Sequence, residues 1–321
     1  MYRVLVSPRT PAPVLDMLRD SGFELKTQTS TDEEITAREI ADCDGFLMDE
    51  GTCTARLLHS APQLKVIGKE SSGLDSIDVA CAQKLGIWVT CARGANARSV
   101  AEHTMALILA CAKNLVTMDH ITRAGGWPRR ERPTLDVYGS TLGIIGLGAI
   151  GKLVARLALA FGMHVLAYDP AAAEFPDGVR RAETPDALLP HCDYVSLHVP
   201  LNDHTYHMIG ARQFALMKPT SFLINCARGA IVDEDALVWA LEEKQIRGAA
   251  LDAFSVEPPE PDSPLLVRDD VIVSPHNAAF TEETTLRMWE YAAQGICEVL
   301  SGELPRLPGN RPAHPRMPLR P

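Results

Sequence analysis

Three side chains suited to binding an anion or moving a proton follow strand-like apolar runs in the second half of the chain: Arg228, Glu257 and His276. A histidine ionises near neutral pH, an arginine can hold a carboxylate, and a carboxylate beside an imidazole fixes its tautomer. Each residue alone has an ordinary explanation, as a surface ion pair, a solvated loop acid or a strand-end cap. Ligands of open parallel sheets bind outside the carboxyl ends of the strands. Because all three residues are expected at these ends, their positions favour acid–base chemistry on a small anion.

A glycine-rich turn lies upstream of these residues. Gly146, Gly148 and Gly151 stand between an apolar run at 142–145 and an amphipathic segment that continues to Phe161. The first glycine of such a turn allows a sharp bend, the second lets the backbone approach a pyrophosphate, and the third lets helix and strand pack closely. A tight turn without a ligand would explain the glycines alone.

The residues after this turn favour a dinucleotide. The first helical N–H groups, near Gly148, Ala149 and Ile150, would face phosphates with the positive end of the helix dipole. A second apolar run, 164–168, ends at Asp169, whose carboxylate would accept hydrogen bonds from the adenosine ribose and repel a 2′-phosphate. The pattern therefore predicts an NAD site rather than an NADP site.

Composition excludes several classes of protein. The 321 residues are 46% hydrophobic and carry a net charge of −10, which argues against nucleic acid as a partner. The longest apolar stretch, 104–112, is too short to span a membrane. Eight scattered cysteines form no CxxC pair or Cys/His cluster, so we expect no metal site and a reducing, cytoplasmic location.

The elements that must position these residues alternate in type. Short strands and helices succeed one another through residues 1–95 and again after 141, which predicts two doubly wound α/β domains with parallel sheets. A long apolar helix at 97–114 would connect the domains, and a helix at 281–301 could cross back to complete the first one. The Pro-rich segment 305–321 is expected to be irregular.

Two loops have an open interpretation. The segment 71–78, SSGLDSID, follows a strand and leads into a helix, so its backbone N–H groups could hold a carboxylate, although an ordinary turn explains it equally well. The loop 125–133 contains Trp127, which either contacts another subunit or anchors its own loop.

Seven segments distributed along nearly the whole chain resemble the NAD-dependent D-2-hydroxyacid dehydrogenases: 71–78, 96–109, 141–155, 198–205, 225–237, 251–258 and 274–278. The resemblance implies a Rossmann NAD-binding domain at 98–284, inserted in a flavodoxin-like substrate domain formed by 1–97 and 285–321. It also implies a homodimer with the active site between the domains.

The resemblance also implies roles for individual residues. Arg228 would bind the substrate, His276 would be the acid and base, and Glu257 its partner. Backbone groups of Ser72 and Gly73 would hold the substrate carboxylate. Cofactor contacts are expected at the glycine turn and after the strands, namely at Ser72, Gly146, Gly148, Ala149, Ile150, Gly151, Asp169, His198, Val199, Pro200, Thr205, Cys226, Ala227, Arg228, Asp252, His276 and Ala278, with Asp252 on the nicotinamide carboxamide.

The implied substrate is a small D-2-hydroxy acid or its 2-keto acid, of the glyoxylate, hydroxypyruvate or pyruvate type. Residues 48–52, MDEGT, replace the arginine-containing segment of phosphoglycerate dehydrogenases, which weakens the case for a phosphorylated substrate. Glu257 stands where formate dehydrogenases carry glutamine, which argues against formate. A phosphoglycerate dehydrogenase and a non-catalytic, NAD(H)-sensing regulatory protein on the same fold remain the alternatives.

Overall fold

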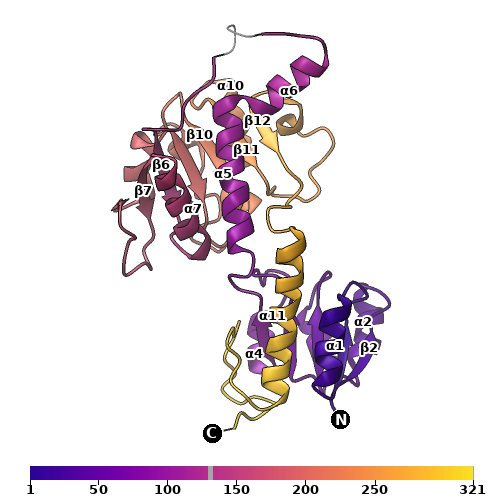
Figure 1. Ribbon diagram of the computed structural model, residues 1–321. Helices are drawn as coiled ribbons and strands as arrows, with labels where there is room; N and C mark the ends of the chain where they lie inside the picture. Colours follow the sequence, from indigo (N-terminus) through magenta and orange to yellow (C-terminus); the bar gives the residue numbers. More distant parts are fainter. Residues whose placement is uncertain (129–132, 321) are drawn as a thin grey trace. The chain divides into compact units, whose positions relative to one another are not determined.

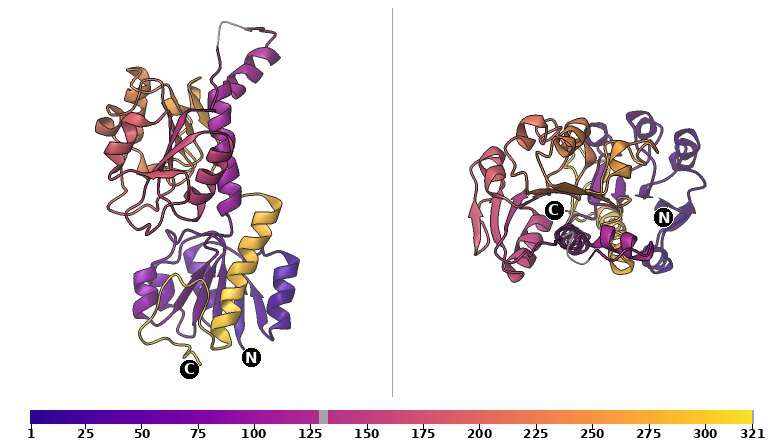
Figure 2. Two further views of the ribbon diagram at one scale, coloured as in Figure 1. Left: turned by 60° about the vertical axis from the view of Figure 1, so that its left-hand side comes forward. Right: turned by 90° about the horizontal axis from the view of Figure 1, so that it is seen from above.

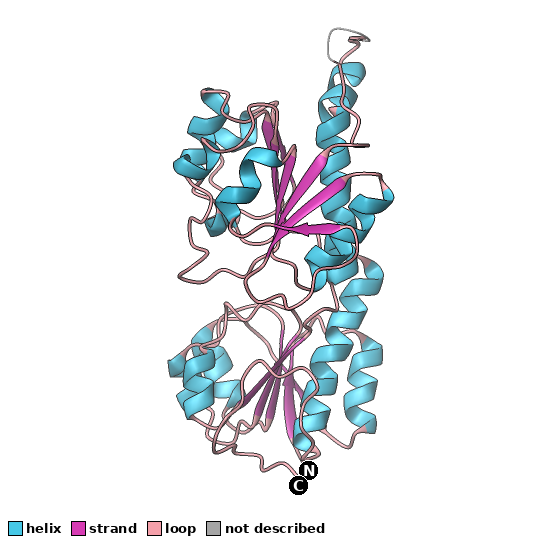
Figure 3. Cartoon of the chain, turned by 90° about the vertical axis from the view of Figure 1, so that its left-hand side faces the viewer, coloured by secondary structure: helices cyan, strands magenta, loops and turns pink. Residues whose placement is uncertain are grey.

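The computed structural model describes residues 1–128 and 133–320, and the chain divides into two compact units (Figure 1). Unit 1 comprises Met1–Asn96 and Thr281–Pro321, and unit 2 comprises Ala97–Phe280. Each unit contains one parallel sheet flanked by helices (Figure 3). The predicted fold class, two α/β domains with parallel sheets, is therefore confirmed.

Unit 1 is built on a five-stranded sheet of order β2-β1-β3-β4-β5. Its strands are β1 (Arg3–Val6), β2 (Glu24–Thr27), β3 (Gly45–Met48), β4 (Val66–Lys69) and β5 (Trp88–Cys91). The inner strands are short apolar runs because both faces of the sheet are covered. Helices α1 (Ala12–Asp20) and α11 (Glu282–Leu300) pack on one face, and α2 (Glu33–Ile40), α3 (Ala55–His59) and α4 (Val79–Lys84) on the other (Figure 2).

The C-terminal segment of unit 1 forms no helix or strand between residues 305 and 320, as the sequence predicts, but hydrogen bonds attach it to the sheet. The side chain of Asn310 is buried; its Oδ1 accepts a hydrogen bond from Val89 N at 2.8 Å and its Nδ2 donates to Ile87 O at 2.8 Å. These bonds satisfy backbone groups of Val89 in the edge strand β5 and of Ile87 just before it, which would otherwise be open to pairing.

Unit 2 is built on a seven-stranded sheet of order β12-β11-β10-β9-β6-β7-β8. The strands are β6 (Thr141–Ile145), β7 (His164–Tyr168), β8 (Val179–Arg181), β9 (Tyr194–Leu197), β10 (Phe222–Asn225), β11 (Gly248–Leu251) and β12 (Val271–Val273). The strand order reverses between β6 and β9, and such a reversal opens a crevice for a ligand at the carboxyl ends of the strands.

Helices cover both faces of the unit 2 sheet. Helices α5 (Ala97–Lys113) and α7 (Ala149–Ala160) contribute to one apolar core, and α8 (Pro185–Leu188), α9 (Ala211–Phe214) and α10 (Glu234–Glu242) to the other. Short 3-10 turns lie at Leu189–His191, Gly229–Ile231 and Pro264–Val267. Helix α6 (Leu115–Arg123) has no buried residue.

Strands β9, β11 and β12 end at Leu197, Leu251 and Val273. As a result, the polar residues that follow them stand in loops at the carboxyl edge of the sheet. None of the helices in the described ranges combines the length and apolar character needed to cross a lipid bilayer.

Candidate active site

The glycine turn leaves room for a ligand at one glycine and is closely packed at the other two. Gly146 has φ +98°, and a Cβ there would lie 2.6 Å from the His198 carbonyl oxygen; a Cβ on Gly151 would lie 2.1 Å from the Gly146 oxygen. By contrast, apart from Gly148 and its two neighbours in the chain, no described residue has an atom within 4 Å of the Cβ position at Gly148. Gly148 is also the N-cap of α7 and supplies no side-chain acceptor, so the turn fits a phosphate approaching the helix N-terminus.

Asp169 follows β7 and lies next to this turn. Its Oδ2 accepts a hydrogen bond from Leu147 N at 2.7 Å, and its Oδ1 accepts from Ala171 N at 2.8 Å and Ala172 N at 3.2 Å. Asp169, Gly148 and Lys152 line a pocket of about 390 Å³. The carboxylate therefore has a fixed position where the adenosine ribose of a dinucleotide is expected.

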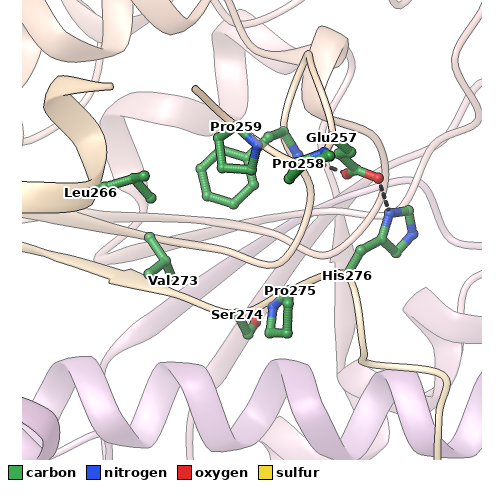
Figure 4. A pocket seen from close by; sticks show the side chains of 9 residues that line it. Glu257, Pro258, Pro259, Leu266, Val273, Ser274, Pro275 and His276 are labelled. Carbon is green, nitrogen blue, oxygen red and sulfur yellow. Dashed lines mark hydrogen bonds and ion pairs between the residues drawn. The ribbon is translucent and has the colours of Figure 1, made fainter. Parts of the chain in front are cut away.

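Glu257 and His276 form a hydrogen-bonded pair. His276 Nδ1 lies 2.7 Å from Glu257 Oε2, while Glu257 Oε1 accepts a hydrogen bond from Phe254 N at 2.9 Å (Figure 4). The side chains are 42% and 38% exposed. With Nδ1 bonded to a carboxylate, Nε2 is the nitrogen that can exchange a proton with a ligand.

A pocket of about 480 Å³ adjoins this pair and is mostly apolar. It is lined by Phe254, Glu257, Pro258, Pro259, Leu266, Val273, Ser274, Pro275 and His276. In Figure 4 the apolar side chains lie on the Glu257 side of the imidazole, and Nε2 points away from them.

Arg228 stands in the loop after β10, which packs on the loop that carries Glu257. A Cβ on the neighbouring Gly229 would lie 1.8 Å from the carbonyl carbon of Phe254, so only glycine permits this backbone approach. Asn225 fixes the arginine loop, because its Oδ1 accepts from Ala227 N at 3.0 Å and its Nδ2 donates to Arg228 O at 2.9 Å. The structure thus brings the loops of the three proposed catalytic residues to one edge of the sheet.

Asp252 is 1% exposed and accepts three hydrogen bonds from the loop that contains His276. Its Oδ1 accepts from Ser274 Oγ at 2.6 Å and from Asn277 N at 3.0 Å, and its Oδ2 accepts from Ala278 N at 3.0 Å. In the described structure the carboxylate therefore holds the 274–278 loop. The expected contact of Asp252 with a nicotinamide carboxamide stays a prediction.

The remaining expected cofactor residues lie in the loops after β9 and β10. His198 Nε2 lies 2.9 Å from Ser196 Oγ; its Nδ1 is buried with no hydrogen-bond partner among the residues described, and burial lowers the pKa of the imidazole to about 4. Such an unpaired buried nitrogen fits a site that a ligand completes. Thr205 Oγ1 bonds within its own loop, to Pro200 O at 2.6 Å, and burial raises the pKa of the Cys226 thiol to about 12.

Unit 1 carries the two expected carboxylate-binding residues after β4. Ser72 Oγ lies 3.1 Å from Ala92 O and 3.0 Å from Asn96 Oδ1, and these bonds fix the turn that contains Gly73.

Charged residues lie at or just after the carboxyl ends of β1, β3 and β4 in the unit 1 sheet. We call Arg9, Asp49, Glu50, Lys69 and Glu70 the unit 1 ionic cluster. Arg9 lies 2.7 Å from Asp49 Oδ2 and 2.6 Å from Glu50 Oε1, and Lys69 Nζ lies 4.0 Å from Glu70 Oε1. Burial raises the pKa of Glu70 to about 6.

Two polar residues near the site are not singled out by the sequence. Lys152 lines the Asp169 pocket, and His103 of α5 lies 3.1 Å from Ser274 Oγ through its Nε2. The sequence shows His103 only as one histidine in a broadly apolar helix. Within the described ranges, no group of three or more His, Cys, Asp or Glu residues is arranged to hold a metal ion.

A doubly wound sheet with a glycine turn, an acidic strand end and a His–Glu pair beside an arginine loop defines the class of nicotinamide-dependent oxidoreductases. Comparison with known families agrees with this class. Residues 105–278 match the model described as "D-isomer specific 2-hydroxyacid dehydrogenase, NAD binding domain", and the chain belongs to this family. The family and the NAD cofactor predicted from the sequence are confirmed.

Individual relatives extend the similarity over nearly the whole chain. The chain is 40% identical to a D-3-phosphoglycerate dehydrogenase of Methanocaldococcus jannaschii, over 98% of this chain but only 61% of that protein. It is 39% identical to a glyoxylate reductase of Korarchaeum cryptofilum, over 94% of both chains. Among solved structures, it resembles a D-lactate dehydrogenase from Aquifex aeolicus complexed with NAD and lactic acid, with a TM-score of 0.86 and 30% identity over 97% of this chain and 100% of that one.

Proposed function

We propose that this protein is an NAD-dependent dehydrogenase that interconverts a small D-2-hydroxy acid and its 2-keto acid. The observation that carries the proposal is the 2.7 Å contact between His276 Nδ1 and Glu257 Oε2, at the same sheet edge as the glycine turn. This pair supplies proton transfer, and the bound nicotinamide would accept or donate the hydride.

In the oxidative direction, His276 Nε2 accepts the hydroxyl proton of the substrate while its Nδ1 stays bonded to Glu257. The carboxylate of Glu257 balances the positive charge that the imidazole gains. In the reductive direction the imidazolium returns this proton to the carbonyl oxygen. Arg228 binds the substrate carboxylate and polarises its carbonyl. A carboxylate contact at the backbone of Ser72 and Gly73 stays a prediction.

The cofactor preference follows from Asp169. Three backbone N–H groups hold its carboxylate in place, so it cannot turn aside from a 2′-phosphate without losing these bonds. Gly148 accommodates the pyrophosphate, because the space where a Cβ would stand is open among the described atoms. We therefore assign NAD rather than NADP.

The unit 1 ionic cluster bears on the substrate. It contains three carboxylates, at Asp49, Glu50 and Glu70, and two cations, at Arg9 and Lys69, which are already engaged with these carboxylates. A second anionic group on the substrate would meet net negative charge near the Ser72 turn. This charge balance favours a substrate that has no second charged group besides its carboxylate, such as glyoxylate, hydroxypyruvate or pyruvate, over a phosphorylated acid.

We also propose that the enzyme is a cytoplasmic homodimer. Helix α6 has no buried residue and exposes Leu115 and Val116, and Trp127 is 75% exposed. Apolar side chains exposed on one segment suit a contact with a second subunit. The eight cysteines are all free thiols, which fits a reducing compartment.

The test is a screen of glyoxylate, hydroxypyruvate, pyruvate and 3-phosphohydroxypyruvate with NADH, ranked by kcat/KM. We expect turnover of the first three acids and a loss of about 10²- to 10⁴-fold in His276→Ala, because general acid–base catalysis contributes this much. His164→Ala is the matched control, since His164 is an exposed histidine at the start of β7. Equal activity of wild type and His276→Ala would disprove the mechanism. Binding of NADH without turnover of any acid would favour the NAD(H)-sensing alternative.

A further inference from the structure

One face of helix α5 reaches both ends of the loop that carries His276. Ser99 and His103 are four residues apart, so they lie on the same side of the helix. Ser99 Oγ donates a hydrogen bond to Ala278 O at 2.6 Å, and His103 Nε2 lies 3.1 Å from Ser274 Oγ. The loop 274–278 is therefore attached to α5 at its first and last residues.

The hydrogen bonds at Ser274 have a defined donor and acceptor at each step. Ser274 has one hydroxyl proton and donates it to Asp252 Oδ1 at 2.6 Å. Its oxygen can then only accept from His103, which requires the imidazole of His103 to carry its proton on Nε2. His103 Nε2 also lies 3.6 Å from Asp252 Oδ1. The histidine thus supports a carboxylate that is 1% exposed and depends on hydrogen-bond donors for its stability.

His276 itself needs this support. Its φ is +50°, in the left-handed region that residues other than glycine rarely adopt. Such a conformation persists only when the surrounding contacts fix it. The hydrogen bonds of Asp252 to Asn277 N and Ala278 N hold the residues immediately after His276, and Ser99 and His103 hold the two ends of the loop.

We propose that Ser99 and His103 are positioning residues that set the geometry of the His276–Glu257 pair through Ser274, Asp252 and the 274–278 loop. The inference rests on the proposed function, in which His276 exchanges the substrate proton. Neither residue touches the reacting atoms in this arrangement. Their effect therefore falls on proton transfer and substrate turnover rather than on binding of the adenosine end of the cofactor.

The experiment compares His103→Ala, His103→Gln and Ser99→Ala with Glu102→Gln, a control at an exposed neighbouring position of α5. A misplaced acid–base residue costs rate steeply, so we expect kcat to fall about 10- to 100-fold in His103→Ala and Ser99→Ala, with the Kd for NADH changed less than about threefold. Glutamine places an amide N–H close to the position of Nε2, so His103→Gln should recover kcat to within a few-fold of wild type. The pH dependence of kcat should change in His103→Ala and return in His103→Gln.

Two outcomes would overturn the proposal. One is an unchanged kcat and pH profile in both alanine variants. The other is a loss of kcat that His103→Gln does not recover and that is accompanied by an equal loss of NADH affinity and thermal stability, as a general packing role would give.

A second readout does not depend on turnover. In protein labelled with ¹⁵N-histidine, His103→Ala should alter the imidazole ¹⁵N chemical shifts of His276, and Glu102→Gln should not. Unaltered chemical shifts in His103→Ala would contradict the positioning role. Inactivity of the wild-type enzyme on every keto acid would reject the proposed function and leave this NMR result standing on its own.

Discussion

At the scale of single residues, the proposed proton transfer depends on which side-chain atoms already have hydrogen-bond partners within the protein. Nδ1 of His276 is hydrogen-bonded to Glu257, and Glu257 accepts a hydrogen bond from Phe254 N, so Nε2 is the nitrogen that the proposed proton transfer uses. Asp169 and Asp252 are also bonded to backbone N–H groups of neighbouring loops. In both cases a carboxylate fixes a loop and remains beside the ligand position that its family role implies.

Asp169→Ala should relax the preference for NADH over NADPH. The substitution removes the charge that repels a 2′-phosphate and the acceptor for the ribose hydroxyls, so we expect the ratio of kcat/KM values for the two cofactors to shift toward NADPH by about 10- to 100-fold. Asp177→Ala, an exposed acid in the same loop region, is the control and should leave the ratio unchanged. Tighter binding of NADPH than NADH by the wild-type protein would contradict the assignment.

At the scale of elements, the sequence predicts the strands and the glycine turn well because both are local patterns. Short apolar runs bounded by turns coincide with β1, β3, β7 and β10, and the strand–turn–helix order identifies the cofactor-binding unit. Helix α6 and strand β8 are not predicted. Helix α6 has no buried residue, and β8 is a three-residue edge strand with two arginines, so neither is part of a buried apolar pattern.

The network around His276 could not be predicted from the sequence for a different reason. His103 and Ser274 are 171 residues apart, and Asp252 and Ser274 are 22 apart, so only the fold brings them together. The sequence indicates the types of the site residues and their places after strands. It does not indicate which donors each carboxylate meets. The roles of the individual site residues remain predictions that the substitutions described above test.

Two glycines of one turn should respond oppositely to alanine. At Gly148 a Cβ meets no described atom within 4 Å, so Gly148→Ala should keep its thermal stability but raise the Kd for NADH at least about tenfold by blocking the pyrophosphate. At Gly151 a Cβ would lie 2.1 Å from Gly146 O, so Gly151→Ala should lower stability by about 1–3 kcal/mol. Calorimetry and NADH titration of both variants measure the two effects. A stable Gly151→Ala or a tight-binding Gly148→Ala would show that the turn is not organised in this way.

At the scale of the whole molecule, one buried group in each unit should contribute to acid stability, and the two contributions should have opposite signs. Burial lowers the pKa of His198 in unit 2 from 6.5 to about 4, so the unfolded state binds more protons between these values and stability falls as the pH decreases through this range. Burial raises the pKa of Glu70 in unit 1 from 4.5 to about 6, so the folded state binds more protons and stability rises as the pH decreases from 6 to 4.5. The shifts correspond to roughly 3 kcal/mol for His198 and roughly 2 kcal/mol for Glu70.

Calorimetry between pH 4 and pH 7 of wild type, His198→Gln and Glu70→Gln separates these contributions, because each variant removes one titrating group from one unit. We compare the free energy of unfolding of each variant with that of wild type at the same pH. This difference should shift in favour of His198→Gln as the pH falls below 6.5, and in favour of Glu70→Gln as the pH rises above 4.5. The other titrating groups are present in both proteins, so their contributions cancel in each difference. If both differences changed with pH in the same direction, the burial of one of these two side chains would be contradicted.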